Sequence, residues 1–357
     1  MEEFIDGYGE GAVLFGIALL VGILFGAAAQ HSRFCLRSAV IEFSSRIWGS
    51  SLAIWLVAFC AAVISVQLSV SFGMLDVSQA RQIAATGSLS GAIIGGLLFG
   101  VGMILARGCA SRLLVLSASG NLRALMTGLV LTLTAQASLR GRLAPLRESL
   151  SGLWTIPGGP SRDLLLIFDL PPGAVLAVVS AGLFAALWLA VVRGTSASRV
   201  IGALLVGIAV GLGWLGTYAV SQASFDVVAV SSITFTGPSA DTLMGLVNER
   251  TLPLGFGSGL VPGVLIGAFG MALLTREARI QRFEPEMPME RYLIGGALMG
   301  FGSMLAGGCA VGAGMSGGSI FALTAWLALF SMWVGATVTQ MALTQFTRSA
   351  GAARTSP

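Results

Sequence analysis

Three of the four cysteines in this chain lie where an apolar run breaks into small or charged residues. Cys35 follows the residues QHSRF, Cys109 follows ARG and Cys309 follows AGG. The fourth, Cys60, lies inside the continuous apolar run WLVAFCAAVISV and is predicted to serve packing only. Because thiols are soft, weak hydrogen-bond donors, three of them at helix breaks would suit a substrate that itself carries sulfur.

Two other uses of cysteine are poorly supported by the spacing. No pair of cysteines forms a CxxC redox motif, and His31 is the only histidine, so no Cys/His cluster of zinc-ligand spacing exists. The sequence therefore predicts no metal site and no cofactor.

The segments that lead to two of these cysteines are copies of each other. GGLLFGVGMILARGCA (95–110) and GGALMGFGSMLAGGCA (295–310) are identical at ten of sixteen positions and lie 200 residues apart. Shared apolar composition explains the matching Leu and Gly residues but not a coincident Gly-Cys-Ala. We expect an internal repeat of one broken helix, as in pseudo-symmetric transport proteins that bind their substrate at the repeat interface.

Composition indicates which elements hold these segments. The chain is 55% hydrophobic and 10% charged, with a mean hydropathy of +0.88, which is typical of a polytopic membrane protein. Its acidic first ten residues do not resemble a signal peptide. All twenty basic residues are arginine, but the net charge of +4 mainly reports loop orientation, so no nucleic-acid partner is expected.

The predicted fold is all-α, with about nine transmembrane helices and re-entrant loops that bend inward. The apolar segments lie near 11–29, 48–70, 88–106, 122–138, 172–192, 199–218, 257–275, 291–307 and 319–342. The turn WTIPGGP (154–160) separates two predicted halves, 1–150 and 160–357.

Arginine clusters predict the orientation of the spans. The clusters at 193–199, 276–291 and 348–354 place the C-terminus in the cytoplasm and, with nine spans, the N-terminus outside. The repeat would then be inverted. The arginine-rich connection 140–162 disagrees with this assignment, and if it is cytoplasmic the repeat is parallel instead.

The helix breaks themselves suit an anion. The glycine-rich run after Cys309 is expected to expose backbone N–H groups, with Ser319 capping the last helix and Ser119 or Asn121 capping the helix after Cys109. The arginines at 33, 37, 107 and 112 could attract the ion at the mouths. Apart from Asp226, no carboxylate lies near a span centre, which favours a simple gated conduit over a proton-coupled antiporter.

Three motifs resemble those of the YeeE/YedE family of sulfur-compound transporters: GAAAQHSRFCLRSA, GMILARGCASRLLVLSASGNLRAL and GSMLAGGCAVGAGMSGGSIFALTAWLAL. The resemblance implies an hourglass-shaped membrane fold, thiosulfate uptake across the inner membrane, and successive contact of the ion with Cys35, Cys109 and Cys309. A fourth loop of the family corresponds to SITFTGPSA (232–240). The remaining expected substrate-binding residues are Gly108, Gly308, Arg107 and Arg37.

The resemblance leaves the substrate open. Where the family often has Gly-Gly-Cys, this chain has Arg107-Gly108-Cys109, and some relatives are linked to selenium metabolism rather than thiosulfate. The family's small cytoplasmic sulfur carrier, a TusA-like protein, is a possible partner and is not fused to this chain. Two other classes remain: a membrane thiol oxidoreductase, which needs folding to pair its cysteines, and a non-selective channel or structural subunit, which tolerates their loss.

Overall fold

The computed structural model describes residue 5 and residues 7–282 and 288–354. Within that part of the chain the protein is helical apart from one pair of two-residue strands. Nine of its helical segments are long and apolar enough to cross a membrane, and they match the nine predicted spans. The prediction of a polytopic all-α membrane protein is therefore confirmed.

Along the described chain the helices and the two short strands follow one another in a single series. They are α2 (Glu10–Ser32), α3 (Leu36–Ser44), α4 (Ser50–Ser71), α5 (Arg81–Ala84), β1 (Gly87–Ser88), α6 (Leu89–Leu105), α7 (Ala110–Ala118), α8 (Leu122–Arg140), α9 (Ala144–Gly152), β2 (Thr155–Ile156), the 3₁₀ turn η1 (Pro160–Arg162), α10 (Leu164–Ile167), α11 (Pro172–Val192), α12 (Ala197–Ala223), α13 (Thr236–Asn248), α14 (Phe256–Leu274), α15 (Met289–Ala306), the π-helix η2 (Ala310–Gly317) and α16 (Leu323–Arg354).

Small residues decide which spans pack against each other. On α6 and α15 the contacts run in opposite directions along the two helices, so these helices are antiparallel. A Cβ at Gly95 would lie 2.5 Å from the Ala306 nitrogen, and a Cβ at Gly295 would lie 2.6 Å from the Ala106 nitrogen. The two contacts correspond, because adding 200 to Gly95 and Ala106 gives Gly295 and Ala306. Such close backbone approach is typical of packing between membrane helices.

The neighbouring pairs follow the same arrangement. Gly96 of α6 lies against Ala328 of α16, and Gly296 of α15 lies against Thr127 of α8. In the other half of the bundle α2 packs along α14 and, in the opposite direction, against α12. Helix α12 packs in turn along α4, where Gly207 meets Ala58. The spans that carry the breaks at Cys109 and Cys309 therefore pack directly against each other.

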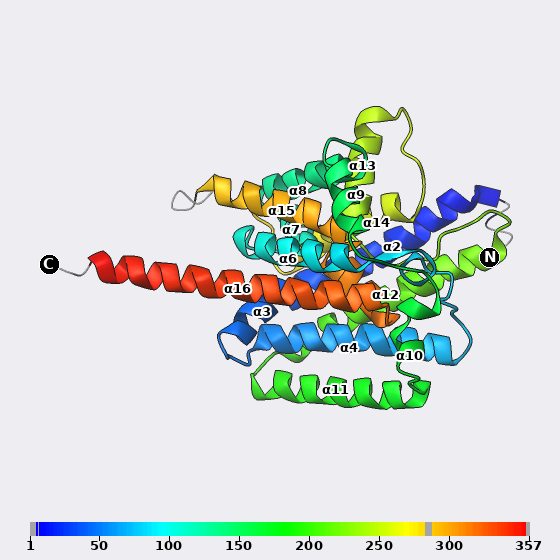
Figure 1. The fold of residues 1–357 in the computed structure, drawn as a ribbon, viewed down its shortest axis with the longest axis horizontal. Coiled ribbons are helices and arrows are strands. Elements are labelled where there is room, and N and C mark those ends of the chain that lie inside the picture. The colour runs from blue at the N-terminus through cyan, green and yellow to red at the C-terminus, as the bar shows by residue number, and fades with distance from the viewer. Residues whose placement is uncertain (1–4, 6, 283–287, 355–357) are drawn as a thin grey trace.

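Helix α11 is peripheral. It packs on α4 and lies at the edge of the bundle in Figure 1. Cys60 faces this contact, since a Cβ at Gly182 of α11 would lie 3.5 Å from the Cys60 Sγ. The predicted packing role of Cys60 agrees with this position.

The bundle has two ends, the Arg33 end and the Gly87 end. At the Arg33 end, Arg33 pairs with Glu277 and Gly120 abuts the backbone of Arg279. At the Gly87 end, β1 pairs with β2, and the backbones of Asp163 and Ala322 form an isolated β-bridge. The predicted WTIPGGP turn lies at the Gly87 end and contains β2, while the buried Arg162 just beyond it bonds to the Ala85 carbonyl and to Thr324.

Candidate functional site

Four short helices begin inside the bundle at the sequence breaks. Cys35 is the N-cap of α3, Cys109 of α7 and Cys309 of η2, and Phe235 precedes α13 in the same way. All three thiols are buried, with 6%, 1% and 1% of each residue exposed. Because a helix N-terminus carries unpaired N–H groups and a partial positive charge, these helices aim anion-stabilising ends at the protein interior.

Cys35 and Cys109 are brought together although they are far apart in sequence. Their thiol groups are close enough to influence each other, and the Cys109 Sγ lies 3.3 Å from the Ser111 Oγ. Arg112 and Arg37 lie within electrostatic range of this thiol pair. In the described part of the chain, Arg37 Nε and Arg112 Nη1 are buried without a hydrogen-bond partner. The cluster therefore combines two thiols with unsatisfied cationic donors.

Further arginines surround this cluster at the Arg33 end. Arg107, Arg123 and Arg291 lie within electrostatic range of Arg37, and Arg123 stacks 4.7 Å from the centroid of the Tyr292 ring. Glu277 also lies in this region, and its oxygens accept from Arg33 at 2.9 Å and from Gln30 at 2.8 Å. The Arg33 guanidinium lowers the pKa of the Glu277 carboxyl. The predicted residues Arg37 and Arg107 thus lie in one basic cluster.

Cys309 lies in a different environment. Its Sγ accepts a hydrogen bond from the Gly312 backbone N–H at 3.4 Å, and its carbonyl accepts from Ala313 N at 2.8 Å. The residues that follow wind into the π-helix η2, so the predicted open glycine loop is wrong. Gly312 lies against Thr234, and a Cβ at Gly317 would lie 2.6 Å from the Ala325 Cβ. Small residues thus admit the wide turn of a π-helix, which is frequent at functional sites.

The predicted helix caps have different outcomes. Asn121 caps α8, as expected, because its side chain accepts from Ala124 N at 2.9 Å. Ser319 does not cap α16, which begins only at Leu323; the Ser319 hydroxyl donates to the Ser316 carbonyl at 2.8 Å instead. The π-helix and the turn after it displace the start of α16 past the serine.

A cavity of about 470 Å³ lies at the Gly87 end beside the Cys309 break. Gly308 and Gly312, which flank Cys309, line it, as does Gly307 in the left-handed conformation with φ 80°. Its charged lining consists of Arg81, Arg140, Arg147 and Asp241. The cavity therefore presents three guanidinium groups above a buried thiol.

Sequence reasoning missed this arginine group as a site. Arg140 and Arg147 entered it only as the connection that disagreed with the predicted orientation. Within the described residues, the Arg147 Nε is buried without a partner, although another nitrogen of this guanidinium pairs with Glu148 at 3.0 Å. Arginines that violate an orientation rule were the available signal that this connection serves another purpose.

The remaining residues singled out from the sequence are two buried glycines and one exposed aspartate. Gly108 and Gly308 are buried immediately before their cysteines. Asp226 is exposed in the non-helical stretch between α12 and α13, so it is not an intramembrane acid. Among the described residues, no group of three or more His, Cys, Asp or Glu side chains could hold a metal ion.

These features define a class of protein: a multi-pass membrane protein whose buried thiols and inward helix termini lie between two arginine-bearing ends. The chain belongs to the sulphur transport family, whose sequence pattern matches residues 31–338. The resemblance to YeeE/YedE transporters is thereby confirmed, and membership in a transporter family implies transport rather than enzymatic catalysis.

Two curated proteins are similar over most of their length. The thiosulfate transporter TsuA of Escherichia coli K12 is 26% identical over 348 residues, which cover 89% of this chain and 91% of that protein. The thiosulfate transporter TsuA of Spirochaeta thermophila is 29% identical over 328 residues, covering 87% of this chain and 93% of that protein.

Proposed function

We propose that this protein carries thiosulfate, or a closely related sulfur anion, across the membrane through a central path lined by Cys309, Cys109 and Cys35. The observation that carries the proposal is the position of the three thiols. Each caps a short helix inside the bundle, and an arginine group lies beyond them at either end. The thiosulfate transporters that align with nine-tenths of this chain support the choice of ion.

The path must replace the water of a divalent anion. An unpaired charge in a low-dielectric passage is very costly, so fixed dipoles have to take over from the hydration shell. Arg81, Arg140 and Arg147 would collect the ion at the Gly87 end. The Cys309 thiol and the N-terminus of η2 would receive it next, and the Cys35–Cys109 pair with Arg37 and Arg112 would receive it last. Gly108, Gly308 and Arg107 shape this path beside the thiols.

We infer that the path lies on a pseudo-two-fold axis in the membrane plane. Under this proposal, residues 12–130 and 202–330 form an inverted repeat within the predicted halves 1–150 and 160–357. The antiparallel α6–α15 contact, with its reciprocal Gly95 and Gly295 approaches, supports an inverted rather than a parallel repeat. The breaks at α3, α7, α13 and η2 would be its re-entrant loops, and they would give the path its hourglass shape.

We further propose that the Arg33 end faces the cytoplasm. Its connections and the helix ends beside them carry seven arginines: Arg33, Arg46, Arg193, Arg199, Arg276, Arg279 and Arg282. The Gly87 end carries more acidic residues: Glu10, Asp76, Glu148, Asp163, Asp169, Asp226, Asp241 and Glu249. The positive-inside rule then puts the 140–162 connection outside, where its arginines face incoming anions. A TusA-like sulfur carrier would collect the sulfur at the Arg33 end.

The test is growth on thiosulfate as sole sulfur source in a bacterial strain that lacks its own uptake systems. Expression of this chain should restore growth, and the Cys309→Ala variant should not. Uptake of labelled selenite and growth on sulfate as sole sulfur source, measured in parallel, separate thiosulfate transport from transport of a selenium compound or of a general oxyanion. Failure to restore growth despite normal membrane expression would refute the thiosulfate assignment.

A thiol oxidoreductase remains a second candidate because folding does bring Cys35 and Cys109 into contact. Purified protein in sealed vesicles distinguishes the two functions. Transport predicts that ³⁵S from thiosulfate accumulates inside with no electron acceptor present. An oxidoreductase predicts instead that the thiol pair cycles to a disulfide with each turnover and that accumulation needs an acceptor.

A further inference from the structure

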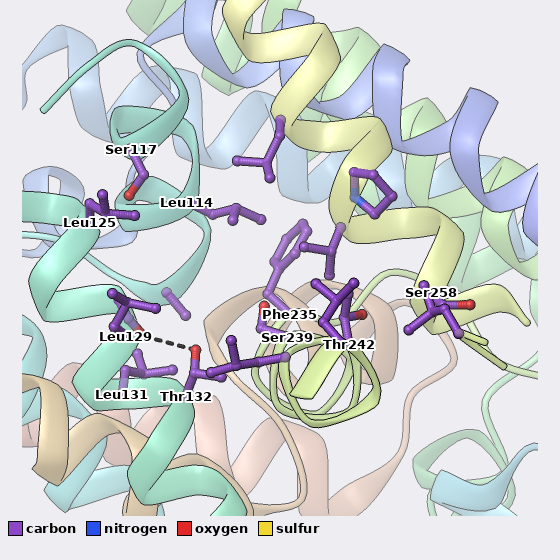
Figure 2. Close-up of a pocket in the computed structure, with 18 of the residues that line it drawn as sticks. Leu114, Ser117, Leu125, Leu129, Leu131, Thr132, Phe235, Ser239, Thr242 and Ser258 are labelled. Carbon is purple, nitrogen blue, oxygen red and sulfur yellow. Dashed lines mark hydrogen bonds between the residues drawn. The ribbon is translucent and has the colours of Figure 1, made fainter. Parts of the chain in front are cut away.

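A second cavity, of about 520 Å³, lies beside the proposed path and is not part of it. Figure 2 shows side chains of α7, α8 and α13 facing this open space, with α14 closing its far wall. The lining, drawn from the described part of the chain, contains no charged residue and consists largely of aliphatic side chains such as Leu114, Leu129, Val261 and Leu265. We call it the α8–α14 groove.

Of the five hydroxyls of the groove, three are satisfied by the protein itself, whereas the Thr242 Oγ1, within the described residues, is buried without a hydrogen-bond partner. Ser117, Thr132 and Ser258 each donate to a backbone carbonyl, at 2.7, 2.8 and 2.8 Å. These three side chains therefore offer mainly their carbon atoms to a molecule bound in the groove. A sulfur anion in this groove would lose its water without gaining a cationic partner, which is prohibitively costly. The groove therefore suits an apolar occupant.

The position of the groove specifies the kind of apolar occupant. Its walls α7, α8 and α14 belong to membrane-spanning segments. The lining extends from Leu125, in the first turn of α8 at the Arg33 end, to Leu252 and Ser258 at the Gly87 end. An elongated apolar groove that runs along membrane-spanning helices opens onto hydrocarbon chains, so the molecules available to fill it are lipids.

The related place in the other half is filled by the protein. A shift of about 200 residues relates α14 to α4 and α8 to α16, and between α4 and α16 lie stacked aromatic rings. Trp55 stacks on Phe59 at 5.2 Å, Phe59 meets Trp326 at 5.5 Å, and Trp55 meets Trp333 at 5.4 Å between ring centroids. On the α8–α14 side, the small residues Gly128 and Ser239 occupy the walls instead. One side of the molecule is packed with rings and the other is left open.

We infer that the α8–α14 groove binds one acyl chain of a membrane phospholipid, which completes the wall of the proposed path. Ala110, which directly follows Cys109, lines the groove, and so does Phe235, whose ring lies 5.1 Å from that of Phe25. The chain would keep water away from the thiols on this side, as the aromatic rings do on the other. The sealing role rests on the proposed function, whereas the binding of the acyl chain does not.

The direct test uses the wild-type protein in nanodiscs made from phosphatidylcholine brominated on one acyl chain. Cryo-electron microscopy should place bromine density inside the groove, between Leu129 and Leu265. Density spread evenly around the protein, with the groove empty or filled by another component, would overturn the inference. Because no transport is measured, this result stands apart from the fate of the thiosulfate proposal.

A pair of variants provides a second reading. A Cβ meets nothing within 4 Å at Gly128 in the groove or at Gly270, which lies on α14 outside it. Gly128→Phe should abolish the lipid retained through purification, measured by native mass spectrometry, while Gly270→Phe should retain it as in the wild type. Equal lipid retention in the two folded variants would contradict the inference. If Gly128→Phe does not fold, Ser239→Phe from the opposite wall replaces it in the same comparison.

Growth on thiosulfate then tests the sealing role separately. Gly128→Phe should support uptake within about twofold of the wild type, since a ring would fill the space that the acyl chain leaves. Loss of uptake in the folded Gly128→Phe variant would contradict the sealing role. Full uptake by the wild-type protein after removal of its retained lipid would contradict it as well.

Discussion

The two cysteine breaks that share a sequence pattern, at Cys109 and at Cys309, differ in what surrounds the thiol. Cys109 lies beside a second thiol, that of Cys35, and near the half-buried Arg112. Cys309 contacts a backbone N–H, that of Gly312, in a π-helix of small residues. The same broken helix thus yields a cationic thiol pair at one place and a thiol with backbone donors at the other.

One position illustrates how this difference arises. Residues 107 and 307 correspond across the offset of 200, and both adopt left-handed backbone conformations, with φ 56° and 80°. Glycine adopts this conformation without strain, whereas arginine does not. At Arg107 the strain accompanies a cation near the thiol pair, and at Gly307 the absence of a side chain leaves room for the cavity. At this position the two matching segments share a left-handed backbone conformation and differ in their side chains.

Removing the thiols should have the largest effect. We expect alanine at Cys35, Cys109 or Cys309 to reduce thiosulfate uptake by at least about tenfold, equivalent to about 1.4 kcal/mol, while Cys60→Ala retains it. Serine should be intermediate at best because it keeps a donor but loses the soft sulfur. Initial rates of ³⁵S uptake measure this. Full activity of a variant that lacks all three thiols would remove them from the mechanism.

Bulk at Gly308 should block the path at the Cys309 break. A Cβ there would lie 2.8 Å from the Ala313 nitrogen, inside the start of η2, so Gly308→Val should abolish uptake while the helix bundle still assembles. A Cβ at Gly295 would instead lie 2.6 Å from the Ala106 nitrogen, between two spans. Gly295→Val should therefore lower the folded yield, judged by size-exclusion chromatography. Equal loss of folding in both variants would leave only a packing role for Gly308.

Arginines at the two ends should differ in the step they affect. Arg147→Gln at the Gly87 end should raise the half-saturation concentration for uptake about fivefold, because it removes an attraction that precedes the thiols. Arg112→Gln beside the Cys35–Cys109 pair should lower the maximal rate instead. Both effects should shrink as the ionic strength rises, because salt screens the attraction between the guanidinium groups and the ion. Identical kinetic changes in the two variants would contradict two separate anion sites.

Substitutions at the two left-handed positions, 107 and 307, test the comparison of the two breaks through protein stability. Gly307→Ala should destabilise the protein by about 1 kcal/mol, because a Cβ disfavours φ 80° although it meets no atom within 4 Å. Arg107→Gly should relieve the corresponding strain while it removes a cation from the Arg33 end. Thermal melting in detergent measures both changes. Opposite signs are expected, and a loss of stability in both variants would show that Arg107 is held by its contacts more strongly than its backbone is strained.

The smallest effect is expected at Glu277, which forms an ion pair with Arg33 at the surface of the bundle. This pairing lowers the pKa of the Glu277 carboxyl, so its stabilising contribution is present above the ordinary carboxyl pKa and is lost as the pH falls through the lowered value. Because both side chains are substantially exposed, at 56% and 38%, Glu277→Gln should cost no more than about 0.5 kcal/mol at neutral pH. The melting temperatures of variant and wild type should converge in acid. A constant difference at all pH values would mean that charge is not the cause.

Much of the architecture follows from local pattern. Runs of about twenty apolar residues predict spans because each must bury its backbone polar groups in hydrocarbon, and all nine predicted segments agree with the described helices. The breaks at the cysteines, the cap at Asn121 and the packing role of Cys60 are likewise readable from a few neighbouring residues. The family itself was recognisable from three such motifs.

What the sequence by itself determined is therefore where the chain crosses the membrane and where it breaks. Tertiary structure alone decided which distant segments meet. It brings Cys35 beside Cys109, places Arg147 in the cavity beside the Cys309 break, and sets α8 opposite α14 across an open groove. It also wound the run after Cys309 into a π-helix, against the expectation of an open loop capped by Ser319. The physical reason is that hydropathy acts within one segment, whereas close backbone approach between small residues, as at Gly95 and Gly295, joins segments hundreds of residues apart.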